Sequence, residues 1–437
     1  MHSRLTTGSK RWTAADADRW LAERAPLGMH FGLERMVALM DCLGRPHERF
    51  RSVHVVGTNG KSSTVRMIAA LLERHGVRTG AYLSPHLVSF TERIEIGERS
   101  VEPRRFAAAV HRVAAAVDHV DASRSPADRV TQFEALTAAA YVELAARGVE
   151  VAVVEAGLGG RYDATSVISS SVQVLTNVGL DHTQLLGPSH GAIAAEKLAI
   201  VPPRGRLVVG AGLHPEADRV AIAVAAQRDA RVLRAAADPS AELGLSGAFQ
   251  RRNFGLAEAA ASALLGAPLR PDAVRDAAAA VRSPGRLEIL DRAPLTVVDA
   301  AHNPDGIGAL MDCVPELRSA HGVRGRLIAV VSILADKDAP RMLEALLAHG
   351  AVLVLTSNSS PRAYTAEELA LIVNDLGGPI AAMVDDPVAA LRDARRLAGP
   401  SGMVLVTGSI CLIGDVLSTI KPRRPESELP LAAATAA

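Results

Sequence analysis

At residues 53–64 the chain reads Val53-His54-Val55-Val56-Gly57-Thr58-Asn59-Gly60-Lys61-Ser62-Ser63-Thr64. The apolar first part predicts a short buried strand, and residues 65–72 predict a helix. A strand, a glycine turn, a lysine and a helix in this order are typical of a phosphate-binding loop, because backbone N–H groups and the helix N-terminus attract phosphate oxygens. Lys61 would reach the outer phosphates of a nucleotide, and Ser62 or Ser63 would hold Mg²⁺.

The loop is a variant of the usual eight-residue pattern, because Val55 stands where that pattern has its first glycine. The alternative interpretation is a glycine turn between a strand and a helix that binds no ligand. A turn of that kind would not need Lys61, so the phosphate loop is favoured.

Composition restricts the class of protein. A chain of 437 residues with 49% hydrophobic residues can bury a large core and form two or three domains. A net charge of +1 predicts no broad attraction to nucleic acid or to membranes. The three cysteines are far apart, so they predict neither a disulfide framework nor a zinc site. The first ten residues lack the apolar segment of a signal peptide and no stretch is long enough to span a bilayer, so we expect a cytoplasmic protein.

Two further strands are predicted close to the phosphate loop. Residues 149–155 end on Glu155 and lead into a glycine-rich loop at 157–164, and residues 172–176 end just before Gly179-Leu180-Asp181-His182. Ligands of parallel α/β sheets collect at the carboxyl ends of the strands. We therefore expect Lys61, Glu155 and His182 to meet at one edge of a sheet.

The remaining pattern predicts an α/β fold with two domains. The first domain, 1–283, has predicted helices at 12–24, 32–40, 103–120, 132–147, 191–201 and 253–265, strands at 79–84 and 206–210, a strand or hairpin at 91–101, and a loop at 121–129. A Pro-Gly break at 283–286 separates it from a smaller parallel α/β domain at 286–420, which lacks a phosphate loop. Its predicted strands are 295–299, 326–332, 351–356, 380–384 and 403–407, with helices such as 340–348, 365–376 and 387–397. Residues 421–437 are predicted to be a disordered tail.

Three residues of the first domain are candidates for chemistry. Glu155 suits Mg²⁺, which prefers oxygen ligands, although a solvated carboxylate at a strand end is the alternative. His182 is an unusual ligand for Mg²⁺, and a lone histidine near a turn is more often structural. Lys197 follows Glu196 on an alanine-rich helix, and this pattern by itself favours a solvated surface lysine.

Three residues near the start of the second domain are also candidates. Arg286 is a linker charge or a ligand for a phosphate bound between the domains. Asp299 would accept hydrogen bonds from a ribose, and His302 would contact phosphate. The alternative for the segment 299–304 is an Asx-type turn with Pro304 at the start of a helix.

Taken together and in order, these stretches resemble the folylpolyglutamate synthase/dihydrofolate synthase family, a branch of the Mur ligases. The resemblance covers nearly the whole chain. It rests on Gly57-Thr58-Asn59-Gly60-Lys61, Ser84-Pro85-His86-Leu87, Thr91-Glu92-Arg93-Ile94, Glu155-Ala156-Gly157-Leu158-Gly159-Gly160-Arg161, Asp163-Ala164-Thr165, Leu180-Asp181-His182, Glu196-Lys197, Pro284-Gly285-Arg286 and Asp299-Ala300-Ala301-His302-Asn303-Pro304.

The resemblance implies a Mur-ligase-type ATPase domain followed by a Rossmann-like domain, and an ATP-dependent amide ligase. In the family, ATP phosphorylates a substrate carboxylate, and the amino group of L-glutamate attacks the acyl phosphate. The acid would be dihydropteroate, a reduced folate, or both. No nucleic-acid or membrane partner is expected, and the protein is expected to be a monomer.

The resemblance also assigns residues to roles. Lys61, Lys197 and His182 would take part in catalysis, and Lys197 is the lysine that the family carbamylates. Mg²⁺ would be held by Ser62 or Ser63, Ser84, Glu155 and His182. ATP would be bound by Thr58, Asn59, Gly60, Lys61, Ser62, Ser63, Asn253, Arg286, Asp299 and His302. The pterin and its carboxylate would contact Arg93, Thr131, Gln132, Phe133, Glu134, Tyr162, Asp163 and Ala164.

Three positions depart from the family pattern. Ser62-Ser63 replaces Gly-Ser after the loop lysine, Ser166 replaces a usual asparagine, and His190 falls near a usual threonine. Two rival functions stay open. One is a related ligase that acts on a different acid, and the other is a nucleotide-binding regulatory ATPase that ligates nothing.

Overall fold

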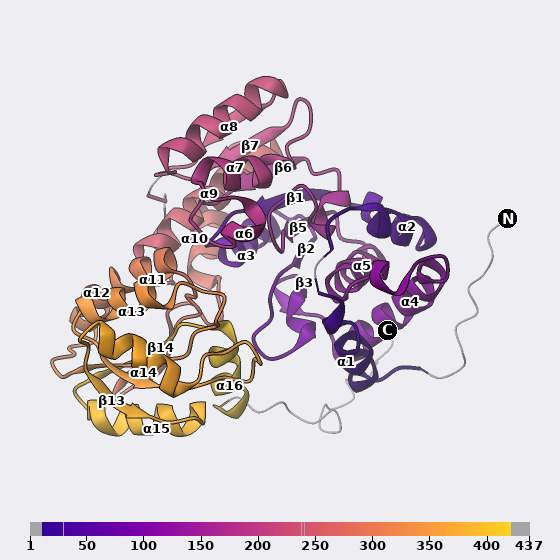
Figure 1. Ribbon diagram of the computed structural model, residues 1–437. Coiled ribbons are helices and arrows are strands. Elements are labelled where there is room, and N and C mark those ends of the chain that lie inside the picture. The colour runs from indigo at the N-terminus through magenta and orange to yellow at the C-terminus, as the bar shows by residue number, and fades with distance from the viewer. Residues whose placement is uncertain (1–10, 29, 237, 240, 421–437) are drawn as a thin grey trace, which may run out of the picture. The chain divides into compact units, whose positions relative to one another are not determined.

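The computed structural model describes residues 11–28, 30–236, 238–239 and 241–420 (Figure 1). The chain divides between Pro284 and Gly285 into two units, called unit 1 and unit 2 below. Each unit contains one β-sheet with helices packed on it. The tail predicted at 421–437 lies outside the described residues. Among the described helices, none is long and apolar enough to cross a membrane.

The sheet of unit 1 has eight strands in the order β4-β3-β2-β5-β1-β6-β7-β8. Strand β1 lies between β5 and β6 and is parallel to both, so the carboxyl ends of these three strands share one edge, as predicted. The edge strands β3 and β4 are antiparallel. The bounds are β1 Arg51–Val56, β2 Thr79–Tyr82, β3 Ile94–Ile96, β4 Arg99–Ser100, β5 Val151–Glu155, β6 Val172–Leu175, β7 Arg206–Val209 and β8 Arg231–Arg234.

Helices bury both faces of this sheet. In β5, Val151 and Val153 face one core and Ala152 and Val154 face another, because successive side chains of a strand point to opposite faces. A strand covered on both faces reads as a continuous apolar run, which is the pattern of residues 151–154. The helices are α1 Ala14–Ala22, α2 Glu34–Cys42, α3 Lys61–Arg74, α4 Pro103–Asp121, α5 Gln132–Ala146, α6 Thr183–Leu186, α7 His190–Leu198, α8 Pro215–Gln227, α9 Ala248–Leu265 and α10 Pro271–Ala280.

Several elements of unit 1 differ from the prediction. Helix α9 begins at Ala248, before the predicted start at residue 253, and Asn253 lies within it. The predicted loop at 121–129 contains a short 3₁₀ helix, Pro126–Asp128, and the predicted hairpin at 91–101 begins with another, Phe90–Arg93. Strand β8 and helices α8 and α10 were not predicted.

The sheet of unit 2 has six strands in the order β13-β12-β11-β14-β10-β9. Its strands β10 to β14 pair in parallel, as predicted, and the strand β9, which was not predicted, pairs with β10 in antiparallel fashion at one edge. Strand β9 carries Glu288, Asp291 and Arg292 and is only half-buried, so it lacks the apolar run that marks its neighbours. The strands are β9 Glu288–Arg292, β10 Leu295–Val298, β11 Leu327–Val331, β12 Val352–Leu355, β13 Ile380–Met383 and β14 Met403–Thr407.

The helices of unit 2 alternate with its parallel strands, as the sequence predicts. This βα repeat gives the parallel part of the sheet its crossover connections. The helices are α11 Pro304–Met311, α12 Val314–Ala320, α13 Ala339–Ala348, α14 Ala366–Asp375, α15 Pro387–Ala398 and α16 Ile410–Ile420.

Candidate functional site

The glycines of the loop between β1 and α3 allow very close packing. Gly60 has a φ of 81°, and a Cβ atom there would lie 2.5 Å from Oδ1 of Asn253. A Cβ atom on Gly57 would overlap Oγ1 of Thr176. The backbone therefore needs glycine at both positions, and α9 reaches the loop through Asn253.

The segment that follows β6 holds this loop in shape. The Thr58 N–H donates to the Asn177 carbonyl at 3.1 Å, and the Asn59 N–H donates to Asn177 Oδ1 at 2.8 Å. The Gly179 N–H donates to Thr58 Oγ1 at 3.0 Å, and Thr176 Oγ1 donates to the Asn59 carbonyl at 2.7 Å. These hydrogen bonds hold the backbone of the loop in one shape.

Two lysines converge on the same loop. Lys61 Nζ donates to the carbonyls of Gly57 and Thr58, each at 3.2 Å, and Lys197 Nζ donates to the Gly57 carbonyl at 2.9 Å. Lys197 lies on α7 and is only 3% exposed, so the pattern-based expectation of a surface lysine is wrong. Burial, aided by the charge of Lys61, lowers the pKa of Lys197 to about 7.

A buried carboxylate lies near Lys61. Glu155, the last residue of β5, is 1% exposed, so it is not a solvated carboxylate. It accepts hydrogen bonds from Ser62 Oγ at 3.0 Å and from the Ser84 N–H at 3.1 Å. Burial raises the pKa of Glu155, and the positive charge of Lys61 opposes that rise. Oxygen atoms of Glu155 and Ser62 therefore meet beside the phosphate loop.

The neighbouring serine faces elsewhere. Ser63 Oγ lies 2.9 Å from Ser283 Oγ, and both residues are buried. The structure therefore separates the two hydroxyls between which the sequence did not decide: Ser62 lies against Glu155, and Ser63 lies against the segment after α10.

His182 lies in the loop after β6, with a left-handed backbone φ of 51°. Its N–H donates to Asp181 Oδ1 at 2.9 Å, and its Nε2 lies 3.9 Å from the same oxygen. The charge of Asp181 also acts on the pKa of Lys197. These contacts connect His182 with Lys197 through Asp181, and they do not by themselves join it to Glu155.

Arg93 is a buried cation near the same carboxylate. Its Nε donates to His86 Nδ1 at 3.0 Å, and its guanidinium lies 5.7 Å from the centre of the Phe90 ring. Burial lowers the pKa of Arg93, and the nearby groups of Tyr82 and Glu155 oppose that effect. Arg93 thus lies within electrostatic range of Glu155.

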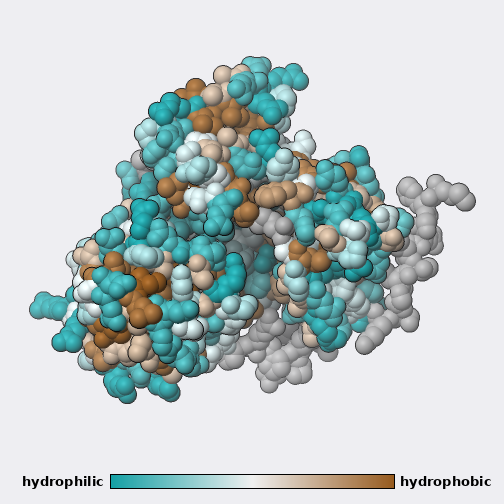
Figure 2. Space-filling model, in the orientation of Figure 1, coloured by the Kyte–Doolittle hydropathy of each residue, from teal (hydrophilic) through white to brown (hydrophobic). Residues whose placement is uncertain are grey.

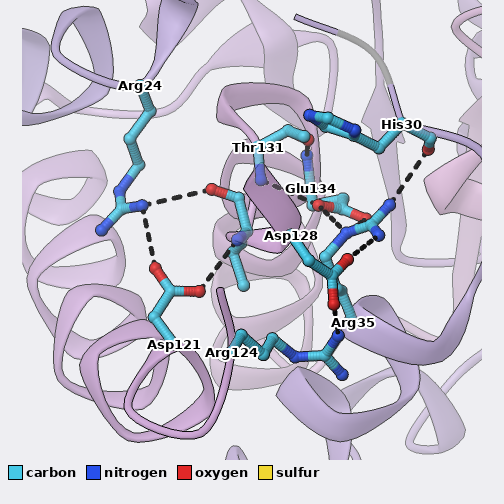
Figure 3. A network of polar contacts seen from close by, with 9 residues as sticks. Arg24, His30, Arg35, Asp121, Arg124, Asp128, Thr131 and Glu134 are labelled. Carbon is cyan, nitrogen blue, oxygen red and sulfur yellow. Dashed lines mark hydrogen bonds and ion pairs between the residues drawn. The ribbon is translucent and has the colours of Figure 1, made fainter. Parts of the chain in front are cut away.

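The segment Thr131–Glu134 is mostly occupied by structural contacts (Figure 3). Thr131 and Glu134 cap α5 reciprocally, with the Thr131 N–H 2.8 Å from Glu134 Oε2. Glu134 also accepts from Arg35 Nε at 3.0 Å, and Gln132 Nε2 donates to the Leu21 carbonyl at 2.9 Å.

Phe133 is the member of this segment that reaches the glycine-rich loop. A Cβ atom on Gly157 would lie 2.5 Å from its ring. The ring of Phe133 therefore packs against one side of the glycine-rich loop, at Gly157.

The predicted residues Tyr162, Asp163 and Ala164 have different surroundings. Asp163 accepts from the N–H groups of Leu158, at 2.8 Å, and Thr165, at 3.0 Å, and from Thr165 Oγ1, and burial raises its pKa. Ala164 is buried. Tyr162 is 47% exposed and meets the ring of Phe31 edge-on at 5.7 Å. Of these three, Tyr162 is the one whose side chain is open to a ligand.

Sequence reasoning missed Gln250, which lies one turn before Asn253 on α9. Asn253 Nδ2 donates to Gln250 Oε1 at 3.2 Å, and within the described residues Gln250 Nε2 is buried without a hydrogen-bond partner. The spacing of three residues could have signalled the pair, because such residues share a helix face.

In unit 2, the candidate residues follow β10. Asp299 is buried and accepts from the Leu287 N–H at 2.9 Å and the Ala301 N–H at 2.8 Å. Burial raises the pKa of Asp299, and Arg286 opposes the rise. His302 Nδ1 lies 2.9 Å from the Ala300 carbonyl. Asp299 therefore forms the Asx-type turn that the alternative interpretation describes, whatever ligand it also binds.

Comparisons with known proteins agree with this architecture. A family model described as the Mur ligase middle domain matches residues 55–211, and one described as the Mur ligase glutamate ligase domain matches residues 285–410. The dihydrofolate synthase/folylpolyglutamate synthase of Mycobacterium tuberculosis is 36% identical, with 87% of this chain and 88% of the relative covered. The folylpolyglutamate synthase of Lacticaseibacillus casei is 34% identical, with 88% and 94% covered.

Solved structures are similar over nearly the whole chain. The Mycobacterium tuberculosis folylpolyglutamate synthase complexed with ADP and AMPPCP has a TM-score of 0.85 at 34% identity, with 94% of this chain and 99% of that chain covered. FolC of E. coli in complex with DHPP and ADP has a TM-score of 0.81 at 28% identity, with 95% and 100% covered.

Proposed function

The chain belongs to the folylpolyglutamate synthase/dihydrofolate synthase family of Mur ligases and is an ATP-dependent ligase, and on this premise we propose how its own residues carry out the reaction. The reaction joins L-glutamate to a carboxylate of dihydropteroate, of a reduced folate, or of both. The observation that supports the assignment most directly is the meeting of Lys61, Lys197, Glu155 and Ser62 around one glycine loop.

ATP binds with its phosphates on the loop 57–60. Lys61 exchanges its two carbonyl partners for phosphate oxygens, which are stronger acceptors because they are charged. The fixed backbone of Thr58 and Asn59 keeps the loop ready for this exchange. Asn253, packed against Gly60, borders the same site, and we assign Arg286, Asp299 and His302 of unit 2 to the nucleotide as well.

The donor set around Glu155 fits Mg²⁺. A buried carboxylate whose pKa is raised by burial gains from a divalent cation, and a serine hydroxyl is a hard oxygen ligand. Glu155 and Ser62 would hold the ion, with Ser84 and His182 as the further assigned ligands. Bound Mg²⁺ would neutralise charge on the phosphate oxygens during transfer.

Lys197 is assigned a covalent role. Addition of CO₂ to its neutral amine forms a carbamate with release of one proton, and only the neutral amine reacts. A pKa of about 7 keeps a large neutral fraction near pH 7. The carbamate would place a negative charge next to the nitrogen that now donates to the Gly57 carbonyl.

The acid substrate lies on the side of Arg93. Its guanidinium would pair with the substrate carboxylate, while Phe133 and the exposed Tyr162 offer ring surfaces for a pterin. The reaction transfers the terminal phosphoryl group of ATP to that carboxylate. The glutamate amine then attacks the acyl phosphate and releases phosphate. Fixed positive groups such as Lys61 stabilise the charge that develops on the transferred oxygens.

The test is a product assay with ATP, Mg²⁺ and L-glutamate, to which dihydropteroate or a reduced folate is added in separate reactions. A glutamate adduct by mass, with one ADP for each adduct, is expected in at least one reaction. Adducts in both would mean that both activities are present. The Lys61→Met variant is the control, and it should form no adduct.

The rival functions give different results. ATP binding without any adduct would overturn the folate assignment and favour another acid. ATP hydrolysis whose rate is independent of glutamate would favour a regulatory ATPase. The expected monomer and the cytoplasmic location stay predictions.

A further inference from the structure

A cluster of possible metal ligands lies on α7 and α8, at residues to which the proposed reaction gives no role. His190 is the first residue of α7, and His214 caps the start of α8, which also carries Glu216 in its first turn. One ligand atom from each of these residues lies within 4.8 Å of the other two. We infer that His190, His214 and Glu216 form a binding site for Zn²⁺ or a similar transition-metal ion, which joins the start of α7 to the start of α8.

The two imidazoles already lie together. Their rings are stacked with centroids 3.8 Å apart and an angle of 11° between the planes. Two imidazole rings this close together can offer two nitrogen ligands to one ion. Neutral imidazole is the form that binds metal ions.

The carboxylate is held in place by α7. Glu216 Oε2 accepts a hydrogen bond from the Gly191 N–H at 3.1 Å. The Glu216 side chain therefore lies against the residue next to His190. A carboxylate has several acceptor sites, and one hydrogen bond leaves others for a cation.

The helices that carry the three ligands are packed firmly. Ile193, Ala194 and Leu198 of α7 share one buried core with Ala217 and Ala221 of α8. Ligands on packed helices are positioned more accurately than ligands on loops. The site therefore needs only side-chain movement to form.

The required movement is small. Tetrahedral zinc with bonds of about 2.0–2.1 Å places its ligand atoms roughly 3.3 Å apart. Atoms now within 4.8 Å must approach by about 1.5 Å, and the rings must tilt, since each nitrogen lone pair lies in its ring plane. His214 is exposed and His190 is partly exposed, so both rings can rotate.

The chemistry of the donors selects the ion. Two nitrogens and one carboxylate suit Zn²⁺, Cu²⁺ or Ni²⁺, whereas Mg²⁺ and Ca²⁺ prefer oxygen alone. The site is thus distinct from Glu155 and Ser62. Because α7 also carries Lys197, a bound ion would restrain the helix that holds this residue.

The test is isothermal titration of the tag-free, full-length protein with ZnCl₂, without nucleotide and with excess Mg²⁺ to occupy oxygen sites. The site variant combines His190→Gln with His214→Asn, since asparagine keeps an N-cap on α8. The matched control combines His321→Gln with His349→Gln, which removes two histidines from unit 2. Wild type and control should bind one equivalent of Zn²⁺ that the site variant does not bind.

Two further measurements keep the inference testable if the double variant folds poorly. Glu216→Gln retains an oxygen acceptor for Gly191 and should weaken Zn²⁺ binding at least about tenfold. Zn²⁺ should raise the unfolding temperature of the wild type and not that of the site variant. Equal stoichiometry and affinity in wild type, site variant and Glu216→Gln would overturn the inference.

Discussion

Ser62 and Ser63 are adjacent in the chain, yet their hydroxyls have different partners, because neighbouring residues of a helix point about 100° apart. Ser62 meets Glu155, and Ser63 meets Ser283. We expect Ser62→Ala to lower kcat by about a hundredfold and to raise the Mg²⁺ concentration needed for activity. Ser63→Ala should keep the Mg²⁺ dependence and cost about 1 kcal/mol of stability, since it leaves Ser283 without its partner.

The measurements for this pair are a Mg²⁺ titration of kcat and thermal unfolding of both variants. A change in Mg²⁺ dependence for Ser63→Ala alone would contradict the assignment of Ser62.

Lys197 provides a second prediction at the residue scale. Protein equilibrated with carbon-13 bicarbonate should show a carbamate signal by NMR that is missing in Lys197→Met and present in the matched Lys337→Met. The signal should increase from pH 6 to pH 8, because the pKa of about 7 makes the reactive neutral amine more abundant over this range. A signal that survives in Lys197→Met would exclude carbamylation at this residue.

His54 predicts how stability depends on pH. Its ring is fully buried, with Nε2 2.8 Å from Thr165 Oγ1, and burial lowers its pKa to about 3 from 6.5. The folded protein keeps the ring neutral, while the unfolded chain takes up a proton below pH 6.5. The contribution of His54 to stability is therefore complete above pH 6.5 and is lost as the pH falls from 6.5 toward 3.

The variant His54→Gln has no such proton uptake. Between pH 6 and pH 4, the difference in unfolding free energy between the two proteins should shift in favour of the variant by about 1.4 kcal/mol for each pH unit. Denaturant unfolding at several pH values measures this difference. Parallel pH curves for the two proteins would contradict the prediction.

At the scale of elements, the ion pairs of Figure 3 join Arg24, which follows α1, to the end of α4, and they join α2 to α5 and to the segment between α4 and α5. Arg35 is 4% exposed and pairs with Glu134 and Asp128. Arg35→Met should cost about 3 kcal/mol, because Glu134 would stay buried without a counter-charge. The exposed Arg45, which pairs with Asp41, is the matched control, and Arg45→Met should change stability little.

Denaturant unfolding of Arg35→Met and Arg45→Met tests this prediction. A double variant, Arg35→Met with Glu134→Gln, should recover part of the loss, since the unpaired charge is gone. Equal stability of Arg35→Met and Arg45→Met would show that the buried pair does not hold these helices together.

At the scale of the whole molecule, both units should contribute to nucleotide binding. ATP at a hundred times its Kd should stabilise the wild type by about 2.7 kcal/mol. Lys61→Met in unit 1 and Arg286→Met in unit 2 should each reduce this stabilisation, whereas the exposed Arg324→Met should not. Thermal unfolding with and without ATP measures the effect. If ATP stabilised Arg286→Met as much as the wild type, Arg286 would not be a nucleotide ligand.

Much of the molecule follows from the sequence by itself, because its signals are local and periodic. The apolar run before Gly57 and the one before Glu155 determine two buried parallel strands, and the glycines with Lys61 determine the loop between β1 and α3. The strand–helix alternation after residue 294 determines the parallel part of the second sheet. Each of these signals needs only a few neighbouring residues to be read.

Only the tertiary structure decided which side chains meet. Arg35 and Glu134 are 99 residues apart in the chain, and Lys197 is 140 residues from the Gly57 carbonyl that it contacts. No periodic pattern in the sequence predicts the burial of Lys197 on an alanine-rich helix or the half-buried edge strand β9. Such contacts depend on how distant elements pack, and packing fixes the partners of a polar group and hence its pKa, which no short stretch of sequence contains.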